Sequence, residues 1–191
     1  GRILFEGQDI TARSAGQLMP FRRKVQIVFQ DPYSSLNPRM TVGRMVGEPI
    51  RVHRIAEGAE VEARVRALLD MVGLSPEYVH RYPHELSGGQ RQRVGIARAL
   101  AAGPRLVVAD EAVSALDVSV RAQILNLLVD LRKRLGLAYL FVSHDLGVIR
   151  FVSHRVAVMY LGKLVEVRPT GLLFQQPLHP YTQALLAAIP A

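Results

Sequence analysis

The stretch that decides the fold is Leu106-Val107-Val108-Ala109-Asp110-Glu111, in which four apolar residues run directly into two carboxylates. A second apolar run, residues 138–142, follows a segment whose pattern predicts a helix over residues 118–135. Continuous apolar runs that alternate with helices are typical of buried parallel strands in an α/β layer. Because such layers bind ligands at the carboxyl edge of the strands, we expect Asp110 and Glu111 at a ligand crevice.

Two adjacent carboxylates at such an edge can divide a reaction between them. One can hold Mg²⁺ while the other orients or deprotonates a water molecule. The alternative is an acidic turn that caps the following helix, and for this pair alone both interpretations stay open.

Three other polar groups lie where a predicted strand or helix begins or ends. Gln30 follows the strand predicted over residues 25–29, and its amide can ligate a metal or position water. His144 follows the second apolar run and can donate a hydrogen bond to a phosphate oxygen. Ser87-Gly88-Gly89 opens a helix, where a hydroxyl, backbone N–H groups and the positive helix end can face a phosphate together.

Each of these groups also has a purely structural interpretation when taken singly. Gln30 can have no role, His144 can make a hydrogen bond at a strand end, and Ser87 can be an ordinary helix cap. The functional prediction depends on the set, since all of these groups lie where an α/β fold binds phosphates.

The helix that opens at residues 86–90 is amphipathic and ends at Gly103-Pro104. Its apolar stripe predicts a buried face, and the polar run Arg91-Gln92-Arg93 lies mostly off that stripe. The other predicted elements are a short strand over residues 1–7, a turn-rich loop over 31–38, a helix over 61–72 stopped by Gly73, and a hairpin of 156–160 and 163–167.

Composition limits the class of protein. The 191 residues are 49% hydrophobic and 21% charged, which fits one globular domain, or one domain with a small satellite, and argues against disorder. The lack of Cys excludes disulfides, Cys-ligated zinc, iron–sulfur clusters and a thiol nucleophile. No apolar run approaches the roughly 20 residues of a membrane-spanning helix, so we expect a protein that is soluble or peripheral to a membrane. The net charge of +8 fits a polyanionic partner or an ordinary basic surface.

Taken together and in order, these segments resemble the ATP-binding subunit of an ABC transporter. The matching residues are Gln30 of the Q-loop, Leu86-Ser87-Gly88-Gly89-Gln90 of the signature, Arg105 to Glu111 of the Walker B strand, Ser114-Ala115-Leu116-Asp117 of the D-loop and His144 of the switch histidine. Two longer stretches, Phe29 to Thr41 and Pro177 to Leu186, resemble the oligopeptide and dipeptide importers, a branch that includes nickel and glutathione relatives.

The resemblance implies an α/β P-loop NTPase fold of the ABC type with a helical signature subdomain. We expect residues 1–191 to form a partial ATP-binding domain. Its helical subdomain would cover about residues 40–100, its catalytic core about 1–39 and 101–165, and a C-terminal extension about 166–191.

The resemblance also implies a role for each matching residue toward ATP and Mg²⁺. Asp110 would hold Mg²⁺ through water, Glu111 would be the catalytic base, and His144 would contact the γ-phosphate. Gln30 would sense the metal and the γ-phosphate. Leu86 to Gln90 would serve the nucleotide bound by a partner subunit, and the D-loop, through Asp117, would tie the two halves together.

The sequence departs from the family pattern at two places. Position 112 is Ala where the family usually has Pro, which we expect to loosen the turn modestly. The larger departure is the Walker A loop, Gly-x4-Gly-Lys-Ser/Thr, whose backbone N–H groups and Lys hold the phosphates. No such loop occurs in the 191 residues, so we expect a chain truncated before Gly1 and inactive by itself.

The resemblance implies partners and a location as well. A second ATP-binding subunit, two transmembrane permease subunits and, indirectly, a solute-binding protein are expected, at the cytoplasmic face of the membrane and without nucleic acid. The leading hypothesis is an ATPase that energises peptide import. The alternatives are a non-catalytic, partner-binding remnant and an ABC-type ATPase with a role outside transport.

Overall fold

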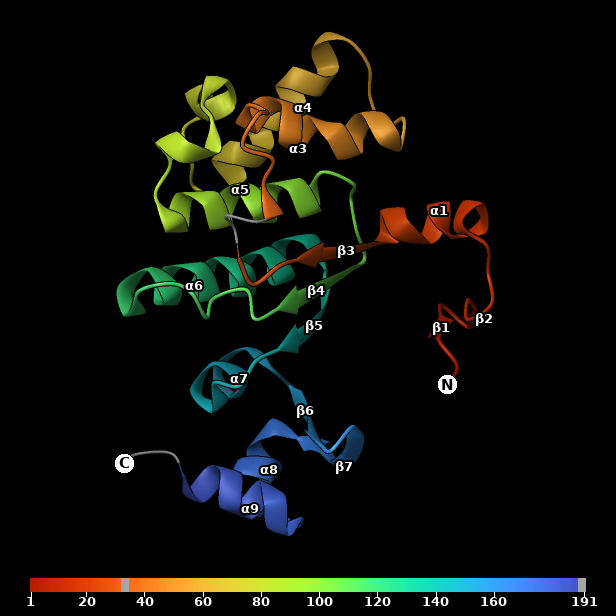
Figure 1. The fold of residues 1–191 in the computed structure, drawn as a ribbon, viewed down its shortest axis with the longest axis vertical. Coiled ribbons are helices and arrows are strands. Elements are labelled where there is room, and N and C mark those ends of the chain that lie inside the picture. Colours follow the sequence, from red (N-terminus) through yellow and green to blue (C-terminus); the bar gives the residue numbers. More distant parts are fainter. Residues whose placement is uncertain (32–34, 189–191) are drawn as a thin grey trace. The chain divides into compact units, whose positions relative to one another are not determined.

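The computed structural model describes residues 1–31 and 35–188 and divides into two compact units, residues 1–140 and 141–191. Figure 1 traces the elements along the chain. Residues 32–34, which belong to the loop predicted over residues 31–38, lie outside the described residues.

The first unit is built on a sheet with the strand order β3-β4-β5. Its strands are β3 (Val25–Val28), β4 (Leu106–Asp110) and β5 (Ala138–Val142), the last of which continues into the second unit. β3 and β4 are parallel, with Val25 opposite Leu106 and Val28 opposite Ala109. The sequence predicts strands at residues 25–29, 106–109 and 138–142, and all three strands are found in this sheet, the first two of them parallel.

The strands differ in how deeply they are buried. Val28, Val107 and Ala109 are buried, as expected for the centre of an α/β layer. In β5 alternate residues face outward, and the side chain of Leu140 is 55% exposed. The prediction of a fully buried strand is thus wrong for β5, because it is the last strand of the sheet within the described residues.

Helices dominate the middle of the first unit, in the upper part of Figure 1. They are α3 (Val42–Val52), α4 (Ala59–Met71), the short 3-10 helices η1 (Pro76–His80) and η2 (Pro83–Glu85), and α5 (Gly88–Leu100). α5 packs against α3, α4 and β3. α4 stops just before Gly73, which has a φ of +72°, as predicted.

The burial of α5 corrects the expected position of its polar run. Arg91 and Gln92 are buried, Gln92 to 1% exposure, although both lie off the apolar stripe. The reason is that α5 has neighbours on several sides, so its polar side chains are enclosed as well. The buried guanidinium of Arg91 has a hydrogen-bond acceptor, because its Nε donates to the backbone oxygen of Pro83 at 2.7 Å.

The remaining elements of the first unit are one long helix and an N-terminal region. α6 (Val118–Leu135) has the predicted bounds and ends at Gly136, in the left-handed region at φ +64°. The N-terminal region consists of β1 (Leu4–Phe5), β2 (Gln8–Asp9) and α1 (Ala15–Lys24).

The second unit is a hairpin with three helices. Its elements are α7 (Leu146–Val152), β6 (Arg155–Tyr160), β7 (Lys163–Pro169), α8 (Thr170–Gln175) and α9 (Pro180–Ala187). β6 and β7 are antiparallel with an irregularity at Val158/Met159, which confirms the predicted hairpin. A small apolar core of Ile149, Val156, Val158 and Leu173 holds the unit together.

Glu166 of β7 ties the C-terminal segment to this hairpin. Its two carboxylate oxygens accept hydrogen bonds from the backbone N–H groups of Leu178 and His179, both at 3.1 Å. Arg168 lies 3.9 Å away as an ion-pair partner. Burial alone raises the pKa of the Glu166 carboxyl, but the donors of the C-terminal segment and the Arg168 charge outweigh it and lower the pKa.

We therefore expect Glu166→Gln to destabilise the second unit by about 1–3 kcal/mol, because the charge-assisted hydrogen bonds that the buried carboxylate accepts from the backbone are weakened. Since the folded-state pKa lies below the unfolded value, this stabilisation is present above the unfolded pKa and is lost as the pH falls through the folded pKa. Urea unfolding of both proteins between pH 7 and pH 3 measures the difference. Equal stabilities across that range, or a difference that grows toward low pH, would contradict the assignment.

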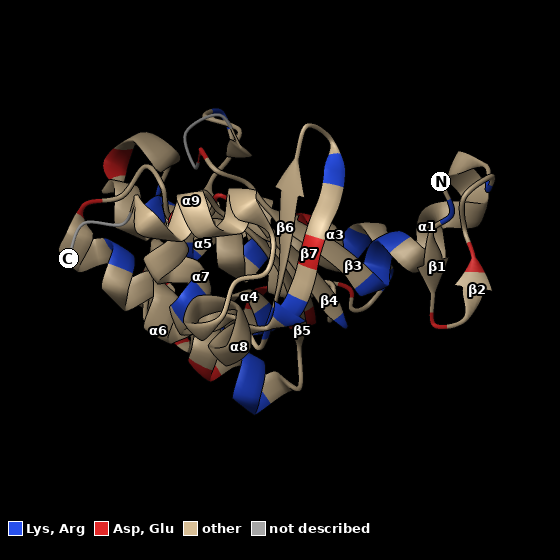
Figure 2. Ribbon diagram, turned by 90° about the horizontal axis from the view of Figure 1, so that it is seen from below, with Lys and Arg blue, Asp and Glu red and all other residues tan. Residues whose placement is uncertain are grey.

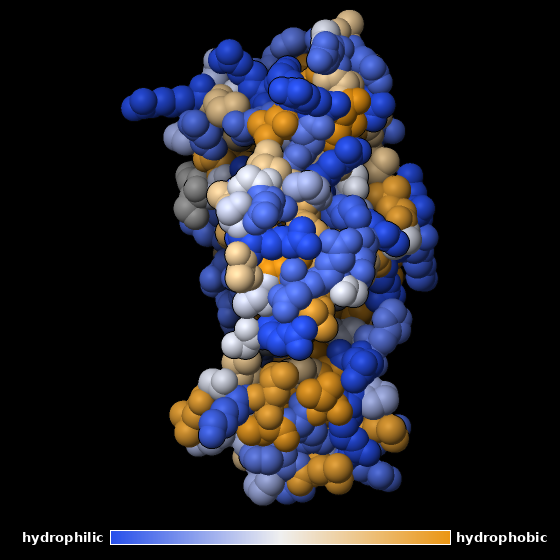
Figure 3. Space-filling model, turned by 90° about the vertical axis from the view of Figure 1, so that its right-hand side faces the viewer, coloured by the Kyte–Doolittle hydropathy of each residue, from blue (hydrophilic) through white to orange (hydrophobic). Residues whose placement is uncertain are grey.

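The surface carries basic and apolar residues in different distributions. Lys and Arg occur on elements of both units in Figure 2, which supports the interpretation of the net charge as a general surface property. Figure 3 shows apolar residues at the surface, and the exposed apolar side chains of the second unit include Met159, Leu161 and Leu164. Within the described residues, every helix is too short or too polar to cross a membrane.

Candidate functional site

The candidate site begins at the carboxyl ends of β3 and β4. Parallel pairing places Val28 opposite Ala109, so the residues that follow each strand leave the sheet at the same edge. Gln30 and Glu111 meet there: Gln30 Nε2 donates a hydrogen bond to Glu111 Oε2 at 2.8 Å. Asp110 is the exposed last residue of β4 and directly precedes Glu111. Three of the predicted site residues are thus gathered at one edge.

Glu111 has an unusual backbone. Its φ of +46° lies in the left-handed region, which residues other than glycine seldom adopt. Its carbonyl oxygen accepts two hydrogen bonds from Ser114, one from the backbone N–H and one from Oγ, each at 3.0 Å. Ala112 and Val113, between these two residues, are both buried. The turn at position 112 is therefore held by packing and hydrogen bonds although proline is absent.

The predicted D-loop, residues 114–117, continues this turn into α6. Leu116 is buried, its N–H donates to the Val113 oxygen at 3.3 Å, and its own oxygen accepts from Arg121 Nη2 at 3.3 Å. Ala115 and Asp117 are exposed. Asp117 precedes the first residue of α6 and makes no side-chain capping bond there.

The predicted signature, Leu86 to Gln90, forms the start of α5. Ser87 is the N-cap: its Oγ accepts from Gln90 N at 3.3 Å, and its N–H donates to Gln90 Oε1 at 3.0 Å. This capping box uses the N–H groups of residues 87 and 90. The N–H groups of Gly88 and Gly89 in the same turn have no acceptor within the helix, which is the arrangement that suits an anion.

Gly89 lies against the first turn of α6. A Cβ at this position would be 2.5 Å from Val120 Cγ1, a distance that side chains do not tolerate. A Cβ at Gly88 would be 3.8 Å from Leu116 Cδ2, which is ordinary contact. A side chain at position 89 would therefore require Val120 to shift, and the start of α5 lies close to the start of α6.

An open groove of about 340 Å³ adjoins the signature. Two of the side chains that line the groove are held by hydrogen bonds. Gln90 Nε2 donates to the Tyr78 hydroxyl at 3.2 Å, and Arg93 Nη1 donates to the Val72 oxygen at 2.6 Å. The lining residues are Gly73, Leu74, Ser75, Tyr78, Ser87, Gly89, Gln90, Arg93, Val120 and Gln123.

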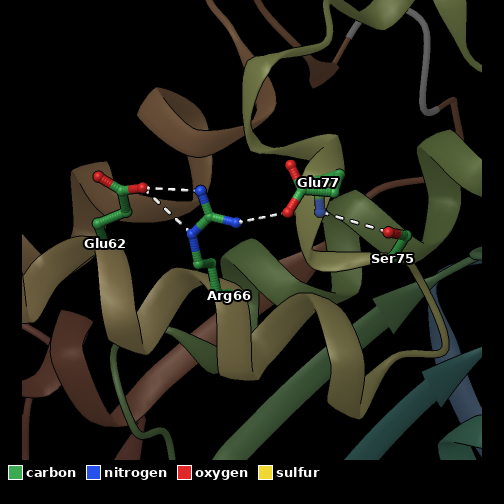
Figure 4. Close-up of polar contacts among 4 residues, drawn as sticks. All are labelled: Glu62, Arg66, Ser75 and Glu77. Atoms are coloured by element: carbon green, nitrogen blue, oxygen red, sulfur yellow. Dashed lines mark hydrogen bonds and ion pairs between the residues drawn. The ribbon is translucent and has the colours of Figure 1, made fainter.

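Polar contacts around Ser75 tie α4 to η1 beside this groove (Figure 4). Arg66 Nη2 pairs with Glu62 of its own helix at 2.9 Å, and its Nη1 pairs with Glu77 of η1 at 3.2 Å. The backbone N–H of Glu77 donates to Ser75 Oγ at 3.3 Å. These exposed pairs position the segment more than they stabilise it.

His144 lies in the second unit and is exposed. It stands between Ser143, whose Oγ accepts from Asp145 N at 3.0 Å, and Asp145, whose Oδ1 caps α7 by accepting from Val148 N at 3.1 Å. The predicted contact of His144 with the γ-phosphate stays a prediction.

The donors at the β3–β4 edge fit Mg²⁺. Within the described residues, no three His, Asp or Glu side chains cluster as a complete metal site. Mg²⁺ does not require one, because it is usually bound by one or two carboxylates together with waters and substrate phosphates. The Asp110 carboxylate and the Gln30 amide oxygen are ligands of this kind.

A family model described as "ABC transporter" matches residues 1–114. The chain belongs to the ABC transporter family. A second model, "Oligopeptide/dipeptide transporter, C-terminal region", matches residues 165–191. Both matches confirm the family and the branch that the motifs predict.

Two sets of relatives extend this result. The glutathione import ATP-binding protein GsiA of Salmonella paratyphi A and that of Escherichia coli K12 are each 58% identical over 190 residues. The match covers 100% of this chain and 30% of theirs, so the chain spans about a third of the length of these relatives.

Solved structures confirm the ABC-type fold. The ATP-binding cassette MJ0796, in a dimeric post-hydrolysis state bound to ADP and Pi, is 31% identical with a TM-score of 0.78, covering 89% of this chain and 73% of that one. CbiO1 from Clostridium perfringens, part of the ABC transporter complex cbiONQ, is 30% identical with a TM-score of 0.81, covering 92% and 68%.

Proposed function

We propose that this chain is the part of an ABC importer's ATP-binding subunit that carries the catalytic carboxylates and the signature, and that it energises import of oligopeptides, dipeptides or glutathione. The observation that carries the proposal is the hydrogen bond between Gln30 and Glu111 next to Asp110. It supports a site in which two strands deliver an amide and two carboxylates to one edge.

In this proposal each group at the edge has one task. Glu111 is the general base that takes a proton from the attacking water. The amide of Gln30 donates from nitrogen to Glu111, which leaves its oxygen as a metal ligand. Asp110 holds Mg²⁺ through water, and His144 donates to the γ-phosphate. Mg²⁺, when bound with ATP, neutralises the charge that develops on the phosphate oxygens.

The signature acts on the nucleotide of a second ATP-binding subunit. The free N–H groups of Gly88 and Gly89, at the positive end of α5, suit a phosphate of the partner's ATP. Two permease subunits and an indirectly engaged solute-binding protein complete the importer, with the ATP-binding pair peripheral to the cytoplasmic face of the membrane.

The helical middle of the chain, about residues 40–100, transmits nucleotide binding to the permease in this proposal. One contact supports the route: Arg98 Nη1 of α5 donates to the Ser35 oxygen at 2.6 Å, which ties the segment after Gln30 to α5. The core would then comprise about residues 1–39 and 101–165, and residues 166–191 the C-terminal extension. The glutathione importers among the relatives support glutathione or short peptides as the solute.

We expect the 191-residue chain by itself to bind ATP more weakly than micromolar, because its sequence contains no Walker A loop to hold the β- and γ-phosphates. Isothermal titration of the purified chain with ATP and Mg²⁺ measures the affinity. Micromolar binding accompanied by turnover that disappears in Glu111→Gln would show that the chain needs no such loop and would overturn this part of the proposal.

A further inference from the structure

The backbone of Glu111 needs a specific restraint. A non-glycine residue at φ +46° persists only where its surroundings hold it there, and such residues gather at functional sites. Glu111 is moreover half-buried and followed by the buried Ala112 and Val113. The direction of the Glu111 carboxylate depends on this backbone conformation.

Ser114 supplies the restraint twice. Its backbone N–H closes the turn on the Glu111 carbonyl at 3.0 Å, as in any tight turn of four residues. Its hydroxyl adds a second hydrogen bond to the same oxygen, also at 3.0 Å. Together the two hydrogen bonds restrain the orientation of the peptide group after Glu111.

The other end of Glu111 is held by Gln30, whose amide nitrogen lies 2.8 Å from Oε2. The carboxylate therefore reaches Gln30 from a backbone that Ser114 holds. If the peptide group after Glu111 rotates, the carboxylate moves away from the Gln30 amide.

We propose that Ser114 is a positioning residue whose hydroxyl keeps Glu111 in the left-handed conformation and so aims its carboxylate at Gln30 and at the attacking water. This inference rests on the proposed ATPase function and adds a task within the chain for a residue of the D-loop. Ser114 touches neither nucleotide nor water in this role and acts through Glu111 alone.

The test compares Ser114→Ala, which removes the hydroxyl and keeps the backbone N–H, with Ser114→Thr, which keeps both donors. Ser119→Ala, an exposed serine in the first turn of α6, is the matched control. In the assembled importer we expect Ser114→Ala to lower kcat for ATP hydrolysis by about 10–100-fold with KM within about two-fold, since small misplacements of a catalytic group are costly. Ser114→Thr and Ser119→Ala keep kcat within about three-fold.

A second readout needs no nucleotide. Backbone chemical shifts of Glu111 in the 191-residue chain report its φ, and we expect Ser114→Ala to move Glu111 out of the left-handed region while Ser114→Thr keeps it there. Unchanged shifts in Ser114→Ala, or an unchanged kcat in an importer whose wild type hydrolyses ATP, overturn the inference. A wild-type importer without ATPase activity overturns the proposed function instead, while the shifts still decide whether Ser114 holds Glu111.

Discussion

Replacing Glu111 by glutamine is expected to lower ATP turnover by the assembled importer by about 10²–10⁴-fold, the usual contribution of a general base. Glutamine keeps the size of the side chain and can still accept a hydrogen bond from Gln30, but it cannot take a proton from water. Steady-state phosphate release measures turnover, and uptake of labelled glutathione or a short peptide by membrane vesicles measures transport. Both rates should fall together, while ATP binding by the importer stays within a few-fold of wild type.

The matched control is Glu57→Gln, which makes the same change at an exposed carboxylate in the helical middle of the chain. It should leave both rates unchanged. Persistence of wild-type turnover in Glu111→Gln would remove Glu111 from its proposed role. A normal ATPase without any solute uptake would instead favour an ABC-type ATPase that acts outside transport.

Replacing Gly89 by alanine is expected to destabilise the first unit by about 1–3 kcal/mol, the usual cost of forcing an extra methyl group into a packed contact. The new Cβ would lie 2.5 Å from Val120 Cγ1, and the β-branched valine has few rotamers with which to avoid it. Displacing the first turn of α5 would also move the signature. ATP turnover by the importer should therefore fall by more than the loss of folded protein accounts for. Urea unfolding and phosphate release measure the two effects.

Two further variants separate the contact from the general effect of a methyl group. Val120→Ala should restore most of the stability lost in Gly89→Ala, as expected when two substitutions share one contact. Gly95→Ala lies in the same helix with nothing within 4 Å of its added Cβ, and it should stabilise by about 0.5–1 kcal/mol. If Gly89→Ala had the same free energy of unfolding as Gly95→Ala, Val120 would move aside at no measurable cost, and the prediction would be wrong.

The regular elements with a strong apolar pattern are those that the sequence predicts best. α6 has the expected bounds, and the pair β3–β4 and the β6–β7 hairpin lie where their apolar runs and turn glycines place them. α1 is missed because none of its residues is buried, so it has no apolar stripe. The signal for α3 is present in the spacing of its buried residues, but the helix predicted from apolar periodicity, over residues 61–72, begins only after it.

Within the site, the positions of residues after predicted strands indicate which residues share an edge of the sheet, but not which of their atoms are in contact. That Gln30 and Glu111 both follow strands is readable from the sequence, and parallel pairing brings them together. The two hydrogen bonds from Ser114 depend on the φ angle of Glu111, which no residue pattern indicates for a non-glycine position. The burial of Gln92 likewise depends on how many neighbours surround α5, a tertiary property.

The contact between Gly89 and Val120 would couple movements of α5 and α6 in the proposed pair of ATP-binding subunits. Because the first turns of α5 and α6 lie close together at Gly89 and Val120, we expect a tilt of one helix to displace the other. The start of α6 is only a few residues from Ser114, and Ser114 is bonded to Glu111. If the chain works in the proposed pair of ATP-binding subunits, a phosphate bound at the signature would be linked by a short path to the carboxylate of the other site, and hydrolysis of the two nucleotides would then be coupled.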